Sequence, residues 1–267
     1  MSKQLQAHLN AIQSQKLKKQ AILMLGLAGS VGKTLFASRV LEEIRRVEPL
    51  DAYVADTKHT ALFSRFGQRG VDGRHNDPSI GVKLFDIRNP EERTVIGEAL
   101  ASQSRKIIID FPYDSIAELL TMLDGAENFM EMFSYDDWQV TIPSVIADKK
   151  SLESFQFLKV TFPEARHIAV INKGLLKEKG LISLLPEIEK EIGNGESMTI
   201  NQLLTKNIIE LVESRPFRDI YVPRDERINP DGGWFPLVDS PLTNRMDIMV
   251  VEGFIKETRD EINRLFP

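Results

Sequence analysis

Cysteine is absent from the 267 residues of this sequence. Its absence excludes disulfide bonds, thiolate metal ligands and a cysteine nucleophile, and fits a reducing compartment. Histidine is scarce, and the four histidines are scattered without the spacing of a zinc site. They are His8, His59, His75 and His167. We therefore expect a fold that depends on its apolar core and a chemistry that uses other side chains.

Long apolar runs and an excess of basic charge are also absent. The apolar run from Ala21, read through its glycines to Gly29, is far shorter than the roughly 20 residues of a membrane span. No apolar segment directly follows the first charged residues, so the signal-peptide pattern is missing. The formal net charge of -5 gives no global basic field for nucleic acid, which leaves only local patches for direct DNA contact. These features predict a cytoplasmic protein without a membrane span.

Predicted strands and helices alternate along the chain from residue 20 onward. Apolar or alternating runs typical of strands occupy 21–25, 52–55, 82–87, 106–109, 140–143, 168–171 and 220–222. Helical spacing occupies 35–46, 91–104, 151–160, 184–192, 200–212 and 246–265. This order predicts an α/β fold, a three-layer sandwich in which a mostly parallel sheet carries helices on both faces.

The first 19 residues differ from the rest and are predicted to form an N-terminal helical extension. Their apolar stripe is thin, and their lysines are unopposed by any acid. We favour a helix packed on the domain surface, and the alternative is a basic arm for DNA, a membrane surface or a partner. No long linker follows, so residues 20–267 are predicted to be one domain.

A glycine-rich turn, Gly29-Ser30-Val31-Gly32-Lys33-Thr34, joins the first predicted strand to a helix. Glycines let backbone N–H groups converge on phosphate oxygens, and the helix N-terminus adds partial positive charge. Lys33 supplies a full charge to the β and γ phosphates, and Thr34 offers a hydroxyl to Mg²⁺. The strict motif has a further glycine where this chain has Leu27. The predicted nucleotide contacts are Ala28, Gly29, Ser30, Val31, Gly32, Lys33, Thr34 and Leu35.

Two aspartates end predicted strands. Asp110 follows three isoleucines, in the manner of a Walker B strand, and Asp56 closes the strand at 52–55. Ligands of open parallel sheets sit at the carboxyl ends of strands, and the Mg²⁺ of a nucleotide needs carboxylates there. The alternative for each is a helix cap or a turn. We predict Lys33, Asp56 and Asp110 as catalytic residues and Thr34, Asp56 and Asp110 as Mg²⁺ ligands.

The tetrapeptide Asn172-Lys173-Gly174-Leu175 follows the strand at 168–171. GTPases have Asn-Lys-x-Asp at this place, and the aspartate accepts two guanine N–H groups. Leu175 accepts no hydrogen bond, so a guanine site would leave donors unpaired at a cost of about 1–3 kcal/mol. This difference favours ATP over GTP.

The order of these parts resembles the ParA/MinD family of deviant Walker A ATPases, which have the P-loop NTPase fold. Residues 28–34 match the Lys-Gly-Gly-x-Gly-Lys-Thr of that family with two substitutions, and Asp110-Phe111-Pro112 resembles its Asp-x-Pro. Tyr221-Val222-Pro223-Arg224 resembles its late strand and Pro-Arg loop. The resemblance implies that Asn172, Pro223 and Arg224 line the adenine.

Two departures from the family pattern bear on turnover. The resemblance implies a dimer in which two subunits enclose two ATP molecules, each reaching across with the first lysine of the motif. Ala28 replaces that lysine, and Asp56 stands alone where the family has two aspartates. Both differences favour slow or absent hydrolysis. Lys58 is one candidate for the lost cation, and the alternative is a solvated loop residue.

The resemblance implies an ATP-dependent homodimer that acts in plasmid or chromosome segregation, in conjugative transfer or in intracellular positioning, through a protein partner or a DNA-bound adaptor. One alternative is a nucleotide-gated adaptor that does not hydrolyse ATP. The other is a P-loop kinase or ligase for a small molecule, with the polar loop at 67–80 and its Arg69 and Arg74 as a lid. An arginine cluster at 215–227 is interpreted as a solvated loop, with DNA or phosphate contact as its alternative.

Overall fold

The computed structural model describes residues 19–58, 60–201, 206–212, 215–220, 242 and 245–267. The predicted helical extension, apart from Lys19, and the predicted adenine-lining residues Pro223 and Arg224 lie outside these ranges. Lys19 is the first residue of strand β1. Of the arginine cluster, Arg215 is described and exposed.

Seven parallel strands form a single sheet in the described part of the chain. They are β1 (Lys19–Met24), β2 (Leu50–Val54), β3 (Lys83–Leu84), β4 (Lys106–Asp110), β5 (Trp138–Ile146), β6 (Arg166–Asn172) and β7 (Glu196–Ile200). Their order is β3-β2-β4-β1-β5-β6-β7, and every pairing is parallel. The carboxyl ends of all strands therefore share one edge, with β1 near the middle.

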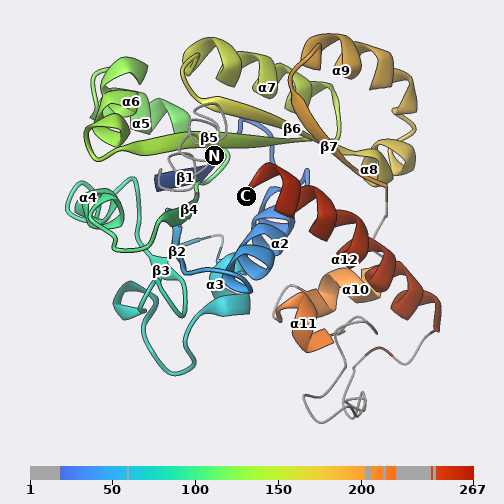
Figure 1. Ribbon diagram of the computed structural model, residues 1–267, viewed down its shortest axis with the longest axis horizontal. Coiled ribbons are helices and arrows are strands. Elements are labelled where there is room, and N and C mark those ends of the chain that lie inside the picture. Colours follow the sequence, from blue (N-terminus) through green and yellow to red (C-terminus); the bar gives the residue numbers. More distant parts are fainter. Residues whose placement is uncertain (1–18, 59, 202–205, 213–214, 221–241, 243–244) are drawn as a thin grey trace, which may run out of the picture.

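Helices cover both faces of the sheet (Figure 1). One face carries α2 (Lys33–Arg45), α3 (Ala61–Phe66), α10 (Lys206–Val212), α11 (Phe217–Ile220) and α12 (Arg245–Leu265). The other carries α4 (Thr94–Leu100), α5 (Ile116–Met122), α6 (Ala126–Tyr135), α7 (Lys149–Thr161), α8 (Lys173–Glu178) and α9 (Leu185–Ile192). Both faces need cover because the strands are apolar on both sides. In β1, for example, Ile22 and Met24 pack against the first set of helices while Ala21 and Leu23 pack against the second. The predicted three-layer α/β sandwich is confirmed.

Helix α12 packs along α2 with the apolar face that its periodicity predicts. Val251, Phe254, Ile255, Ile262, Leu265 and Phe266 are all buried. Between the two helices Arg39 is fully buried, forms ion pairs with Glu42 and Glu43 on α2, and donates from Nε to the Thr258 hydroxyl of α12 at 3.1 Å. A buried charge needs such partners because an uncompensated one is strongly destabilising.

Several predicted boundaries are wrong. The helix predicted from Ile200 is wrong at that residue, because residues 196–200 form β7, in which Ile200 pairs with Asn172 of β6, and the described helix α10 covers Lys206–Val212. Ile220 ends helix α11 instead of starting a strand, and Pro216, whose fixed φ suits a helix start, directly precedes that helix. The rest of that predicted strand lies outside the described residues.

The segment from 82 to 104 is also less regular than predicted. Strand β3 is only Lys83–Leu84, and the helix predicted over 91–104 is Thr94–Leu100. Glu92 holds the connecting loop instead, since its carboxylate accepts from the Asp86 N–H at 2.8 Å and from the Asn89 amide at 2.9 Å. Sequence analysis missed α3, α5, α6 and α8, which are short, and the 3₁₀ turns Gly73–His75 and Ile182–Leu184.

Candidate functional site

The loop between β1 and α2 has the backbone geometry of a phosphate cradle. Ser30 has φ of 56° and Gly32 has φ of 96°, and Gly32 is the N-cap of α2. A Cβ at Gly32 would lie 3.2 Å from the side-chain nitrogen of Asn172, so glycine is needed for both conformation and space. The first N–H groups of the 13-residue helix α2 lack partners within the helix and are oriented for an anion.

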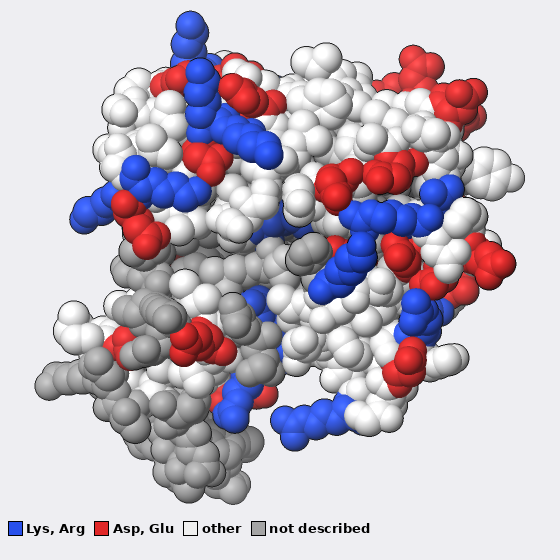
Figure 2. All heavy atoms as spheres, turned by 180° about the vertical axis from the view of Figure 1, so that it is seen from behind, with Lys and Arg blue, Asp and Glu red and all other residues white. Residues whose placement is uncertain are grey.

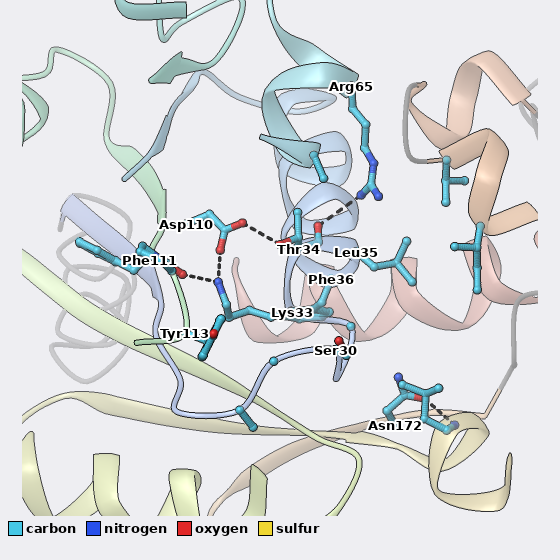
Figure 3. Close-up of a pocket in the computed structure, with 18 of the residues that line it drawn as sticks. Ser30, Lys33, Thr34, Leu35, Phe36, Arg65, Asp110, Phe111, Tyr113 and Asn172 are labelled. Atoms are coloured by element: carbon cyan, nitrogen blue, oxygen red, sulfur yellow. Dashed lines mark hydrogen bonds and ion pairs between the residues drawn. The ribbon is translucent and has the colours of Figure 1, made fainter. Parts of the chain in front are cut away.

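Lys33, Thr34 and Asp110 converge at the start of this helix (Figure 3). The Lys33 ammonium contacts the Asp110 carboxylate and the main-chain carbonyl of Phe111. The Thr34 hydroxyl donates to the other Asp110 oxygen at 3.0 Å. Asp110 is 5% exposed, so its charge is compensated by these two neighbours instead of by water. The structure thus brings together three residues that the sequence placed at one site.

Asp56 lies at the same edge, just after β2, and is 2% exposed. One of its oxygens accepts the Lys58 N–H at 2.8 Å and lies 4.0 Å from Nη1 of Arg88. Lys58 itself takes part through its backbone, and its side chain is exposed and outside the cavity lining. The cation nearest Asp56 among the described ion pairs is therefore Arg88, which sequence analysis did not single out.

Asn172 joins the phosphate loop to the end of β6. Its amide donates to the Val31 carbonyl at 3.3 Å, and its side-chain oxygen accepts the Leu175 N–H at 3.1 Å as the N-cap of α8. Both side-chain groups are thus engaged with the protein, and the residue positions the loop. Its predicted contact with adenine is not tested by these bonds.

A cavity of about 630 Å³ runs along the loop. It is lined by ten of the residues predicted as contacts, namely Ala28, Gly29, Ser30, Gly32, Lys33, Thr34, Leu35, Asp56, Asp110 and Asn172. Val31 is buried and does not line it. Beyond Leu35 the lining is apolar and comes from Leu175, Ile200, Ile209, Val212 and Phe254. The cavity therefore has a polar end at Asp56 and Asp110 and an apolar end beside Asn172.

Arg65 and Tyr113 also line the cavity, and sequence analysis singled out neither as a site residue. Arg65 reaches from α3 to the first turn of α2, where Nη1 contacts the Ser38 hydroxyl and lies 3.4 Å from the Thr34 carbonyl (Figure 3). The Tyr113 ring lies over the loop, 3.7 Å from where a Cβ of Gly29 would be. No local motif marks either residue, because each reaches the site only through the packing of another element.

The loop at 67–80 does not form a lid over the cavity. The Asn76 side chain accepts the Gln68 N–H at 2.6 Å and fixes the loop on itself. Arg74 pairs with Glu92 at 3.1 Å, and neither Arg69 nor Arg74 lines the cavity. The predicted lid of a small-molecule kinase is therefore not supported by these contacts.

The donor set at the polar end fits Mg²⁺. It offers the hydroxyl of Thr34 and the carboxylates of Asp110 and Asp56, which are oxygen donors of the kind this ion prefers. Within the described residues, no three His, Asp or Glu side chains come together as a metal cage. This is the usual arrangement for Mg²⁺ that arrives with a nucleotide and keeps several waters.

Comparison with known proteins places this geometry among solved structures. No protein-family model and no curated sequence gives a match. MinD from Aquifex aeolicus superposes with a TM-score of 0.51 at 11% identity, over 92% of this chain and 96% of MinD. A chain of the Aquifex aeolicus MinC:MinD complex superposes with a TM-score of 0.51 at 13% identity, over 92% of this chain and 95% of that chain. A Borrelia burgdorferi B31 protein ascribed to plasmid partition, with AMPPNP bound, superposes with a TM-score of 0.50 at 13% identity, over 93% of this chain and 98% of that protein.

The chain has the fold of MinD. The resemblance predicted from the motifs is thus confirmed at the level of the fold, as is the P-loop NTPase architecture. In this MinD-like fold Ala28 is 5% exposed and carries no charge at the position where the family motif begins with lysine. No helix among the described residues is long and apolar enough to cross a membrane.

Proposed function

We propose that this chain binds ATP with Mg²⁺ in the P-loop cavity. The single observation that carries the proposal is the convergence of Lys33, Thr34 and Asp110 at the N-terminus of α2, behind a loop with left-handed residues at Ser30 and Gly32. This arrangement presents backbone donors, one ammonium and one hydroxyl to a polyphosphate. The AMPPNP held by the Borrelia protein of the same fold supports a nucleoside triphosphate.

The apolar end of the cavity favours adenine over guanine. Leu175 lines it where a guanine site requires an acceptor, and Ile200 and Phe254 add further apolar surface. Guanine would bury its N–H donors unpaired there, at a cost of about 1–3 kcal/mol. Asn172, held between Val31 and Leu175, would lie between the base and the phosphates.

The groups at the polar end of the cavity would promote hydrolysis of the bound ATP. Lys33 would exchange its contact with Asp110 for the β and γ oxygens, while Thr34 and the two aspartates would hold Mg²⁺, which supplies charge neutralisation. Asp56 would orient the attacking water. The lysine missing at Ala28 and the single carboxylate at Asp56 favour slow turnover.

The cellular role that we propose is a nucleotide-dependent dimer switch in segregation, transfer or positioning of DNA cargo. The support is the shared fold with MinD, which has been solved with MinC, and with a protein ascribed to plasmid partition. Lysine and arginine alternate with acids over the described surface in Figure 2, so this face offers no continuous basic field. We therefore favour a protein partner or DNA-bound adaptor over direct DNA contact.

Calorimetry with ATP, ADP and GTP in the presence of Mg²⁺ tests the binding proposal. Wild type is expected to bind both adenine nucleotides and to prefer ATP to GTP, whereas Lys33→Ala loses most of the affinity. Lys58→Ala is the matched control, because it removes an exposed lysine near the same site. Absence of heat for folded wild type would refute the proposal.

A non-hydrolysing adaptor is the second candidate, and the uncharged Ala28 favours it. Phosphate release and sedimentation with ATP separate the two functions. The switch predicts slow release and a dimer with ATP, and Ala28→Lys should increase one or both. The adaptor predicts tight ATP binding with release at background. No gain from Ala28→Lys would remove the support for an enclosed dimer.

A further inference from the structure

Three adjacent strands bring one arginine and two carboxylates together next to the polar end of the cavity, which Asp56 lines and which Arg88 and Asp114 do not. In the order β3-β2-β4, Arg88 follows β3, Asp56 follows β2, and Asp114 follows Asp110 at the end of β4. The Arg88 guanidinium donates from Nη2 to Asp114 at 2.5 Å and lies with Nη1 4.0 Å from Asp56. Arg88 therefore joins the loops that follow β2 and β4, which lie on the same side of the phosphate cradle.

The direction of a bound nucleotide determines what would face Arg88. The apolar end of the cavity and Asn172 lie beside β6 and β7, on one side of the P-loop, while Asp56 lies on the other side, beyond β4. Figure 3 shows the same separation, with Asn172 and Asp110 at opposite ends of the pocket. A base at the apolar end therefore directs the phosphate chain towards Asp110 and Asp56, and the last phosphate is the one nearest Arg88.

We propose that Arg88 recognises the terminal phosphate of ATP and so distinguishes ATP from ADP. The inference rests on the proposed function. In it, Arg88 supplies from within the subunit the positive charge that Ala28 does not provide. Asp114 holds the guanidinium beside the site when no triphosphate is bound, and binding of the triphosphate exchanges this carboxylate for phosphate oxygens.

The surroundings of Arg88 suit such an exchange. Its backbone is fixed, because its N–H donates to Asp86 at 3.0 Å and the neighbouring Ile87 carbonyl accepts from Arg93 at 2.8 Å. Its side chain is 29% exposed and its Asp114 partner is 51% exposed. An exposed ion pair of this kind is worth little, whereas arginine binds phosphate with charge-assisted, bidentate hydrogen bonds. The other cations of the site are held elsewhere, Lys33 by Asp110 and Arg65 by the first turns of α2.

The test compares Arg88→Gln, Asp114→Asn and the double variant by calorimetry with Mg-ATP and Mg-ADP. We expect Arg88→Gln to weaken ATP binding about fivefold to tenfold and to leave ADP binding unchanged. Asp114→Asn should strengthen ATP binding, because it releases the guanidinium. The double variant should behave as Arg88→Gln. Arg74→Gln is the matched control, since it breaks the exposed pair with Glu92 in the same region.

Opposite effects of Arg88→Gln and Asp114→Asn on ATP affinity distinguish phosphate recognition from a purely structural role of the ion pair, here called a latch. A latch would be broken equally by Arg88→Gln and Asp114→Asn, so changes of the same sign for ATP and ADP would overturn the inference. Equal affinity of Arg88→Gln and wild type for ATP would also overturn it. Should wild type bind neither nucleotide, the proposed function itself fails. If binding of ADP and ATP requires Lys33 but is unchanged in Arg88→Gln, the proposed function holds and only this inference is refuted.

Discussion

Replacing Lys33 by alanine is expected to destabilise the protein even without nucleotide. The Lys33 and Asp110 side chains are 14% and 6% exposed, so their ion pair is largely shielded from water. Lys33→Ala leaves the Asp110 carboxylate buried with the Thr34 hydroxyl, which donates to it at 3.0 Å. Removing one partner of a buried pair costs about 3–5 kcal/mol, and the remaining hydrogen bond reduces this to about 2–3 kcal/mol.

The loss should appear as a lower melting temperature. For a chain of this size each kcal/mol lowers Tm by about 2–4 °C, so we expect a fall of about 5–10 °C in nucleotide-free buffer. Circular dichroism of wild type, Lys33→Ala, Asp110→Asn and the double variant forms a complete cycle. The double variant should recover part of the loss, because an amide tolerates burial without a cation better than a carboxylate does. Additive losses, or a Lys33→Ala variant as stable as wild type, would refute this reasoning.

Three further predictions concern the loop, the buried network and pH. Gly32 has φ of 96°, and a Cβ added there would lie 3.2 Å from the side-chain nitrogen of Asn172. Gly32→Ala should therefore lower the free energy of unfolding in urea by about 1–2 kcal/mol and abolish the heat of nucleotide binding. Gly125→Ala, at φ of 122° with open space around it, is the control for backbone strain alone. Arg39→Met should cost about 2–4 kcal/mol, because it removes the guanidinium that pairs with both Glu42 and Glu43, while Glu43 keeps Arg46 at 3.6 Å; a loss below about 1 kcal/mol would contradict the role given to the network. Burial lowers the pKa of His167 below its usual 6.5, and its bond to the Phe162 carbonyl opposes this shift only in part. Near and below pH 6.5 the unfolded chain therefore binds more protons than the folded one, so the free energy of unfolding should decrease as the pH falls through this range. His167→Gln should flatten that part of the stability profile, and an unchanged profile would show that other groups cause it.

The sequence predicted best where one residue pattern determines the outcome. The continuous isoleucines before Asp110 correctly predicted a strand that is buried at every position. The apolar spacing of Val251, Ile255 and Ile262 likewise predicted the buried face of α12. The loop with Lys33 and Thr34 was found because its contacts are local in sequence. At Ile200 the prediction failed, because the apolar spacing of 200–212 gave no sign that β6 would pair with that residue.

The missed parts of the site depend on distant packing. Arg65 reaches Thr34 across 31 positions of sequence, and Arg88 reaches Asp114 across 26. Both contacts follow from the order of strands in the sheet, in which β3 lies beside β2 and β2 lies beside β4. Neighbouring positions in the sequence carry no mark of that order. A single sequence therefore predicts the cradle but not the cations that surround it.

The buried bridge from Arg39 to Thr258 has a mechanical consequence. It joins the helix that starts at the phosphate cradle to a C-terminal helix of 21 residues, which is about 30 Å long. The bridge couples the two helices at Thr258, so a rigid tilt of α12 by about five degrees about this point would move its first residue, about 20 Å away along the helix, by about 2 Å. A shift of α2 around a bound phosphate would therefore be expected to reach the surface that α12 presents.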